Sequence, residues 1–386
     1  MYPINNHKDF IIPSRIMKLV YKLGLAYGVA ELVHQLLYWH RYTYFNNMRN
    51  MNEYPMTAIR IMIQSLMKKN PLLLQRTKLY KHTEHIKNEN DVCDALIPHY
   101  KERPANQLQV GCSRLYWRFS PLALELFMKS LRQTGNLYLR YVQGFSRTWH
   151  KTDDGYYSVW SHHISGTKPI LFFPGLGLGA VPYAKFAKIF GRTVHIVEVP
   201  NIGYSTPLSN RQATLKTLYE VVSKHVEDGT DVFAHSFGSV MTAMYLNAIH
   251  DKPHPQQNVV ICDGFVNPCD IITTHIYPFV GLTDYSVIRK KPRRWYEFFL
   301  FVYFGIYNIE FQAWAKRFHN VYANTLWRCY PNTNINYVFS KHDILYDTEF
   351  IAENSDCVLL PKGSHGYSIF GRFDKQIYIQ MIEAGK

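Results

Sequence analysis

The sequence predicts an α/β protein in which a mostly parallel β-sheet is covered by helices on both faces. Two observations lead to this fold class. From about residue 136 onward, short apolar runs alternate with helical stretches, as in chains that build a parallel sheet through helical crossovers. Of the 386 residues, 47% are hydrophobic and 19% are charged, which supports a large buried core and excludes a disordered or coiled-coil chain.

The strands are expected in two groups. Leu137–Gln143 and Tyr156–His162 alternate apolar with other residues on either side of the turn sequence TDDG, and so predict a hairpin. The other strands are short apolar runs: Ile170–Phe173, Val194–Val199, Asp231–Ala234, Val259–Cys262, Ile335–Phe339 and Cys357–Leu360. Helices are expected between them at Tyr183–Phe190, Arg211–Glu227 and Phe237–Ala248.

The first 135 residues differ from the rest in charge and pattern. They hold 19 basic and 9 acidic side chains, a net charge of +10 within the chain's total of +14, and their apolar residues recur at helical spacing. We therefore predict two parts: a basic helical N-terminal region over residues 1–135 and an α/β domain over residues 136–386. The basic excess favours an anionic membrane surface as partner, because no zinc-finger spacing or RNA-binding motif points to nucleic acid.

The stretch Leu23–Trp39 is the most apolar part of that region. It nearly has the length of a bilayer-spanning helix, but Glu31, His34 and Gln35 interrupt it. A buried or interface-lying helix is therefore the favoured interpretation, and a single span is the alternative. The start of the chain lacks a secretory leader pattern, and the six cysteines form neither a C-x-x-C pair nor a metal-binding spacing. These features predict a cytoplasmic protein or one attached to the cytoplasmic side of a membrane.

Residues 234–238, Ala-His-Ser-Phe-Gly, fit a small-x-Ser-x-Gly pattern directly after a predicted strand and before a predicted helix. A sharp strand-to-helix turn needs small residues two positions before and two after the serine, and it lifts the hydroxyl clear of the sheet. The helix N-terminus also favours the negative charge that develops there during acyl transfer. Ser236 is therefore the candidate nucleophile.

A serine hydroxyl needs a base and an orienting carboxylate before it can attack a carbonyl. His365, in GSHG, and Asp343, in SKHD, follow the last two predicted strands, at the strand ends where parallel sheets form their sites. Asp263, which follows the preceding strand, and Asp347 are the rival acids. His235, beside the nucleophile, is expected to pack rather than to act as a base.

The glycine-rich segment PGLGLG at residues 174–179 follows the strand Ile170–Phe173. Glycines let the chain pass close to a reacting carbonyl, so that a backbone N–H can face the oxyanion. We expect the N–H groups of Leu176 and Phe237 to form this oxyanion hole. A nucleotide-binding loop is disfavoured because the Lys-Ser/Thr ending is missing.

Together these motifs resemble the α/β-hydrolase family over about residues 136–386. The matching segments are PGLGLG (174–179), VPNIGYS (199–205), AHSFGS (234–239), KHDILY (341–346) and GSHG (363–366). Two positions depart from the family pattern: Pro174 stands where a histidine is usual, and Ala234 replaces a glycine. The resemblance implies a helical cap inserted over Gly264–Asn334. Within it, the apolar run Phe298–Ile309 is the suspected substrate-contacting segment.

The sequence thus predicts a serine hydrolase of the esterase or lipase class that cleaves an apolar carboxylic ester or thioester, a lipid included. Neither a metal nor another cofactor is expected, because water completes the turnover. Two alternatives stay open. An acyltransferase would use the same triad with an alcohol or lysolipid in place of water, and a non-catalytic scaffold would bind lipid or a partner through the basic N-terminal region.

Overall fold

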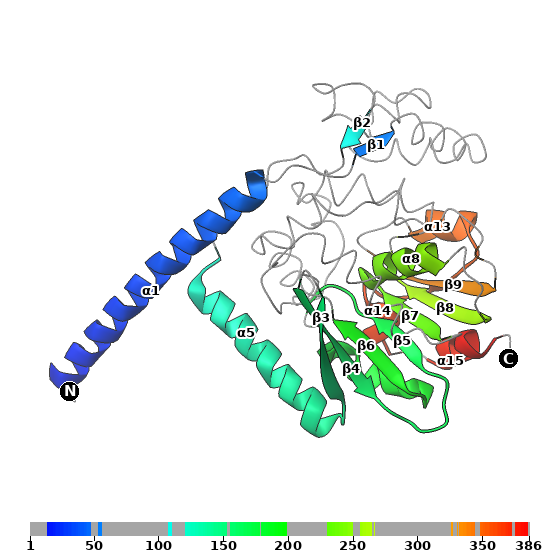
Figure 1. Cartoon of the computed structure of the whole chain (residues 1–386), viewed down its shortest axis with the longest axis horizontal. Coiled ribbons are helices and arrows are strands. Elements are labelled where there is room, and N and C mark those ends of the chain that lie inside the picture. Colours follow the sequence, from blue (N-terminus) through cyan, green and yellow to red (C-terminus); the bar gives the residue numbers. More distant parts are fainter. Residues whose placement is uncertain are drawn as a thin grey trace, which may run out of the picture.

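A computed structural model describes residues 14–47, 53–55, 107–109, 120–152, 155–177, 179–198, 230–249, 255–264, 266, 326, 330, 332–343, 348–372 and 375–384 (Figure 1). Its centre is an eight-stranded sheet with the order β10-β9-β8-β7-β5-β6-β4-β3. The strands are β3 (Ser146–Thr152), β4 (Gly155–His162), β5 (Ile170–Phe173), β6 (Val194–Glu198), β7 (Asp231–His235), β8 (Gln257–Cys262), β9 (Thr333–Ser340) and β10 (Cys357–Leu360). Every neighbouring pair from β6 to β10 is parallel, whereas β4 pairs antiparallel with β3 and β6. The predicted mostly parallel sheet is confirmed.

Helices cover both faces of this sheet because its central strands are apolar on both sides. In β5, Leu171 and Phe173 face the core that contains helix α8 (Gly238–Ile249). Ile170 and Phe172 face the opposite core, which contains α6 (Ala184–Ala187) and α15 (Gln376–Glu383). Shorter elements complete the described part: η1 (Tyr138–Val142), η2 (Val181–Tyr183), η3 (Lys188–Phe190), α13 (Thr348–Asn354), α14 (Tyr367–Phe370), and the separate strand pair β1 (Glu53–Pro55) with β2 (Gln107–Gln109).

The predicted strand Leu137–Gln143 is wrong. Helix α5 (Leu122–Leu137) runs through its start, and a π-helical turn occupies Tyr138–Val142. The hairpin is formed instead by β3 and β4, which pair Thr152 with Gly155 across the predicted turn. Leu139 is buried while Leu137 and Tyr141 are exposed, so the alternating apolar residues do not share one buried face.

Helix α5 is anchored to the sheet by a buried ion-pair cluster. Arg132 of α5 and Arg147 of β3 lie 2.8 Å and 3.0 Å from one carboxylate oxygen of Glu198, at the end of β6. Burial alone would raise the pKa of Glu198, but the two guanidiniums outweigh it and hold the pKa below its usual value. Met128 and Gly135 on the same helix are also buried.

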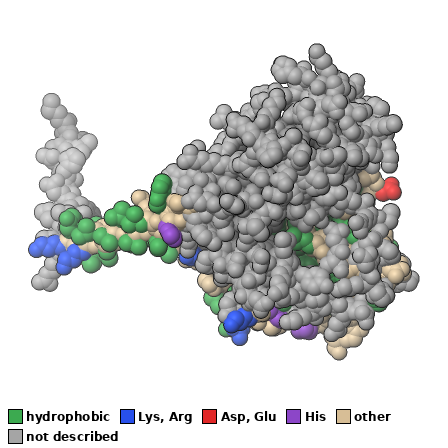
Figure 2. Space-filling model, turned by 45° about the horizontal axis from the view of Figure 1, so that its top comes forward, with side chains coloured by type: hydrophobic (Ala, Val, Ile, Leu, Met, Phe, Trp, Pro, Cys, Tyr) green, Lys and Arg blue, Asp and Glu red, His purple; other side chains and the backbone are tan. Residues whose placement is uncertain are grey.

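Helix α1 (Ser14–Asn47) leaves the body of the molecule as a long arm (Figures 1 and 2). Its large apolar side chains are 46–73% exposed: Leu19, Val20, Tyr21, Leu23, Leu25, Tyr27, Val29, Leu32, Val33, Leu36, Leu37 and Trp39. None of the helices that the structure describes, α1 included, combines the length and hydropathy needed to cross a bilayer.

The polar residues that interrupt the apolar stretch of α1 attach it to the start of α5. Both carboxylate oxygens of Glu31 accept the Leu122 N–H, at 3.3 Å and 3.2 Å, and His34 Nε2–H donates to the Ser120 carbonyl at 2.9 Å. A carboxylate in this place satisfies a helix-terminal N–H and complements the helix dipole. Tyr38 is buried in the same core as α8.

Several predicted segments lie outside the described residues. These are the helix Arg211–Glu227, the apolar run Phe298–Ile309, the rival acid Asp347, the NIGYS segment at residues 201–205 and most of the expected cap Gly264–Asn334.

Candidate active site

Ser236 lies at the sharp turn between β7 and α8. Its φ of 50° is in the left-handed region, where a residue with a side chain is strained, and such strain is typical of a nucleophile at a strand-to-helix turn. The turn is held by a hydrogen bond from the Ser236 N–H to the Cys262 carbonyl on β8, at 2.8 Å. A Cβ on Gly238 would lie 2.0 Å from the Phe173 carbonyl oxygen, so only glycine fits there. The spacing of small residues around the serine thus has a steric cause.

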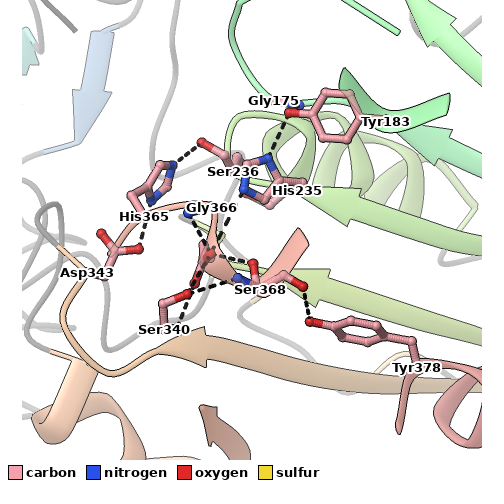
Figure 3. A network of polar contacts seen from close by, with 12 residues as sticks. Gly175, Tyr183, His235, Ser236, Ser340, Asp343, His365, Gly366, Ser368 and Tyr378 are labelled. Carbon is pink, nitrogen blue, oxygen red and sulfur yellow. Dashed lines mark hydrogen bonds and ion pairs between the residues drawn. The ribbon is translucent and has the colours of Figure 1, made fainter. Parts of the chain in front are cut away.

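The structure brings Ser236, His365 and Asp343 together from three strand ends (Figure 3). Ser236 Oγ lies 2.7 Å from His365 Nε2, and His365 Nδ1 lies 2.7 Å from an oxygen of Asp343. Because the buried Asp343 carboxylate accepts at Nδ1, a neutral His365 carries its proton there and leaves Nε2 free to accept the serine proton. This arrangement can activate a serine hydroxyl.

The parallel sheet with this order, the strained serine after β7 and the His and Asp after its last two strands decide the fold family. The chain has the α/β-hydrolase fold. Within this fold, Ser236 directly follows β7, Asp343 follows β9 and His365 follows β10.

Comparisons with solved structures find similarity at low sequence identity and low TM-score. No protein-family model and no curated protein matches the sequence. A membrane phospholipase A described as a bacterial virulence factor is 12% identical, with 68% of this chain and 93% of that chain covered and a TM-score of 0.46. Carboxylesterase CesB from Bacillus subtilis is 10% identical, with 68% of this chain and 99% of that chain covered and a TM-score of 0.44. Haloalkane dehalogenase DbeA from Bradyrhizobium elkani is 11% identical, with 63% of this chain and 100% of that chain covered and a TM-score of 0.41.

The glycine-rich loop after β5 passes directly beside Ser236. A Cβ on Gly175 would lie 3.1 Å from Ser236 Cβ and 2.7 Å from His235 Nδ1, so glycine is required for this approach. Leu176, the next residue in the loop, and Phe237, the residue after Ser236, are the two expected oxyanion donors. Their positions in the chain place both backbones next to the serine.

Two side chains fix this loop from outside it. The Gly175 N–H donates to the Tyr183 hydroxyl at 2.9 Å, and the Ala180 N–H donates to Glu198 at 2.8 Å. The buried carboxylate of Glu198 thus couples the end of the loop to the ion pairs with Arg132 and Arg147. Neither Tyr183 nor Glu198 stood out in the sequence, because each acts through a partner distant along the chain.

The rival acid Asp263 is fully buried beside the triad, and the carboxylate that lies 2.7 Å from Nδ1 of His365 is that of Asp343. Its carboxylate accepts hydrogen bonds from the Ser340 N–H at 2.7 Å, the Gly366 N–H at 3.0 Å and the Ser368 hydroxyl. Burial and the neighbouring Asp343 carboxylate raise the pKa of Asp263 to about 6.

His235 is buried behind the nucleophile, as expected for a packing residue. Its Nδ1 lies 2.9 Å from the Tyr183 hydroxyl, and its ring lies beside that of His365. Burial, assisted by the positive charge that His365 can carry, holds the pKa of His235 well below its usual value, so the ring stays neutral.

Asp263, Asp343 and His365 have ligand-type atoms within 4.8 Å of one another and would be the first residues to consider for a metal ion. The pair His365 Nδ1 and Asp343 is separated by only 2.7 Å, a hydrogen-bond distance that is shorter than the spacing of two ligands around one ion. The geometry therefore matches a hydrogen-bonded acid–histidine pair better than a metal centre.

Proposed function

We propose that this protein is a serine hydrolase that cleaves an apolar carboxylic ester or thioester. The observation that supports it best is the continuous chain from Ser236 Oγ through the His365 ring to Asp343, with 2.7 Å at each step. The serine lies on the strained turn that such nucleophiles occupy, and a glycine-rich loop lies against it.

The proposed reaction has two halves. His365 Nε2 takes the proton of Ser236 while Oγ bonds to the ester carbonyl carbon, and the N–H groups of Leu176 and Phe237 face the oxyanion. The protonated His365 then gives its proton to the leaving alcohol or thiol, and the acyl-enzyme remains. In the second half, His365 takes a proton from water, the hydroxide oxygen bonds to the acyl carbon, and Ser236 leaves with a proton as the acid is released.

Asp343 would act on the histidine rather than on the substrate. Its buried carboxylate holds the Nδ1–H tautomer and favours the imidazolium that forms in each half-reaction. The suspected substrate-contacting segment Phe298–Ile309 would supply an apolar surface for the acyl chain.

The proposal extends to a membrane surface as the place where an apolar substrate is met. The exposed apolar residues of α1 follow one another closely enough in the chain to lie on all sides of the helix, and Figure 2 shows the apolar side chains of one face. Lys18 and Lys22 are exposed near its N-terminal end. A protein groove covers one side of a helix, whereas lipid can surround the tip of an arm. Each basic residue near an anionic membrane adds about 1 kcal/mol of attraction.

A fluorophosphonate probe tests the catalytic proposal. We expect the wild-type protein to be labelled at Ser236 and the Ser236→Ala variant to remain unlabelled, because the probe traps only an activated serine. A series of p-nitrophenyl esters with increasing chain length then reports the acyl preference, which we expect to favour longer chains. A folded wild-type protein that neither reacts with the probe nor cleaves any ester would contradict the proposal.

Vesicle co-sedimentation tests the membrane proposal. We expect binding to phosphatidylserine vesicles that weakens with added salt, because exposed charges are screened within about 10 Å at roughly 0.1 M. The double variant Leu25→Glu with Val29→Glu should lose binding, since both side chains are exposed on α1. The control Ser165→Glu with Gln256→Glu adds the same charge at exposed loop positions and should still bind. Equal binding by both double variants would refute α1 as the attachment site.

A further inference from the structure

A second buried carboxylate lies behind the proposed triad without a part in the reaction described above. Asp263 follows β8, and one of its oxygens, one oxygen of Asp343 and a ring nitrogen of His365 all lie within 4.8 Å of one another. The φ of Asp263 is 47°, in the left-handed region that residues with side chains rarely adopt. Such strain at a fully buried acid is typical of a position with a functional constraint.

The Asp263 carboxylate is bonded to both segments that carry its neighbours. On β9 it accepts the Ser340 N–H at 2.7 Å and the Ser340 hydroxyl at 3.1 Å, three residues before Asp343. In the histidine segment it accepts the Gly366 N–H at 3.0 Å, directly after His365. The hydroxyl of Ser368 donates to the same carboxylate oxygen as Gly366. One carboxylate therefore ties the acid segment to the histidine segment.

On its other side, Asp263 is connected to the glycine-rich loop through His235 and Tyr183, which Figure 3 shows next to Gly175. The Gly175 N–H donates to the Tyr183 hydroxyl, and that hydroxyl lies 2.9 Å from His235 Nδ1. With its own oxygen accepting from Gly175, Tyr183 donates its proton to Nδ1, so the neutral His235 carries its proton on Nε2. That nitrogen faces Asp263 at 3.9 Å. The polar chain thus reaches from the oxyanion side of the site to its acid side.

We propose that Asp263 is a positioning residue for the hydrolytic site, which holds the segments of Asp343 and His365 in register and adds negative charge that favours the protonated His365. This rests on the proposed function, because only a histidine that accepts and returns a proton gains from the second charge. Asp343 fixes the ring through a direct hydrogen bond, whereas Asp263 acts through the backbone and through the field across a few ångströms.

The charge state of Asp263 gives the proposal a measurable signature. Its pKa of about 6 means that the carboxylate is ionised at neutral pH and neutral in mild acid. The two carboxylates and the histidine titrate as a coupled group. The other titratable groups that face Asp263 are His235, Tyr183, Cys262 and Tyr378.

The test is the pH profile of kcat/KM for a p-nitrophenyl ester in three variants. Asp263→Asn keeps the size and removes the charge, so we expect a roughly 10- to 100-fold lower plateau and an acid limb shifted to lower pH, because the protonated His365 loses a neighbouring negative charge. Ser368→Ala removes a hydrogen bond that stabilises the ionised Asp263, so the acid limb should move in the same direction by a smaller amount. Tyr378→Phe removes a hydroxyl bonded to the Ser368 carbonyl and should leave the limb in place.

A shift of the acid limb to lower pH in both variants, larger in Asp263→Asn than in Ser368→Ala, supports the proposal. An unmoved limb in both overturns it, since a merely structural acid would lower activity without moving the limb. Melting temperatures identify a variant that fails to fold, and Ser368→Ala then carries the test alone. Fluorophosphonate labelling of the wild-type protein separates the two hypotheses. A wild-type protein that is not labelled refutes the proposed function, whereas a labelled protein with unmoved limbs refutes only the role of Asp263.

Discussion

Helices α8 and α1 are both apolar around most of their circumference, yet they lie in opposite surroundings. In α8 the apolar side chains are buried against β5 and β7: Val240, Met241, Ala243, Tyr245 and Leu246. In α1 most of the apolar side chains are exposed, and the polar Glu31 and His34 contact the start of α5, while Tyr38 alone among the large apolar side chains described in this helix is buried. An apolar composition therefore does not determine whether a helix is buried. The sheet covers α8, whereas no described element covers most of α1.

The difference in burial also suits the two helices to different roles. The N-terminus of α8 follows the strained Ser236, so this helix must be rigid for the chemistry proposed here. Within the described part of the chain, the contacts of α1 with the body include those of Glu31, His34 and Tyr38, and most of its large apolar side chains are exposed. The predictions below test each side of this contrast.

The largest effect is expected at the N-terminal end of α8. Because the triad residues act as a unit, Ser236→Ala and His365→Ala should each lower kcat by roughly 10⁴-fold or more, and the double variant should be scarcely worse. Steady-state ester hydrolysis measures this, and vesicle binding through α1 should stay unchanged. Near-normal activity of Asp343→Asn together with loss in Asp263→Asn would show that the acid has been assigned wrongly.

A matched pair of leucines compares the two helices directly. Leu246 on α8 is fully buried and Leu32 on α1 is 57% exposed. Leu246→Ala should lower the free energy of unfolding by about 2–5 kcal/mol, whereas Leu32→Ala should change it by less than about 0.5 kcal/mol. Urea titrations of the full chain provide both values. A cost above about 1 kcal/mol for Leu32→Ala would mean that α1 is buried in solution, and the contrast would fail.

The pH dependence of stability gives a third test, behind the α8 turn. The pKa of Asp263 is about 6 in the folded protein against an ordinary value of 3.8, so the unfolded state loses this proton first. The contribution of this group to stability is therefore complete below pH 3.8 and is lost as the pH rises through 6, by up to about 3 kcal/mol. Urea titrations between pH 4 and 8 should show this slope in the wild-type protein and a flatter profile in Asp263→Asn. Equal slopes would contradict it.

The smallest effect is expected where α1 meets α5. Glu31→Gln keeps the shape that accepts the Leu122 N–H but removes the charge next to the helix terminus. The loss should be about 0.3–1 kcal/mol and should shrink with added salt. Thermal melts at low and high salt measure it. A salt-independent loss of several kcal/mol would show that Glu31 has a larger part than capping α5.

The sheet was predictable because its central strands are short apolar runs, and β5 and β10 begin and end at the predicted residues. The strand predicted at Leu137–Gln143 failed for a physical reason. Alternation of apolar residue types indicates a strand only when one set is buried, and here Leu137 and Tyr141 are exposed at the end of a helix.

The part of the candidate site that lies in short local motifs was predictable from the sequence. Ser236, Asp343 and His365 each lie in a short segment whose position after a strand indicates its place in the sheet. The part that sequence reasoning missed depends on contacts between distant segments. No local sequence pattern indicates that the Tyr183 hydroxyl binds the glycine-rich loop, because an aromatic residue in a helix is common in any core. The same holds for Asp263, whose hydrogen bonds join two distant segments, because an acid after a strand is also common.

The ion pair between Arg132 and Glu198 has a consequence for how the molecule can be divided. Glu198 fixes the Ala180 end of the glycine-rich loop, and Arg132 on α5 is one of its two buried cations. A fragment that begins at residue 136 would leave Glu198 with Arg147 alone and would uncover the site where Met128 is buried. A shortened piece that keeps this support of the loop therefore has to include α5. Shorter pieces would keep every triad residue and still lose the support of the loop beside it.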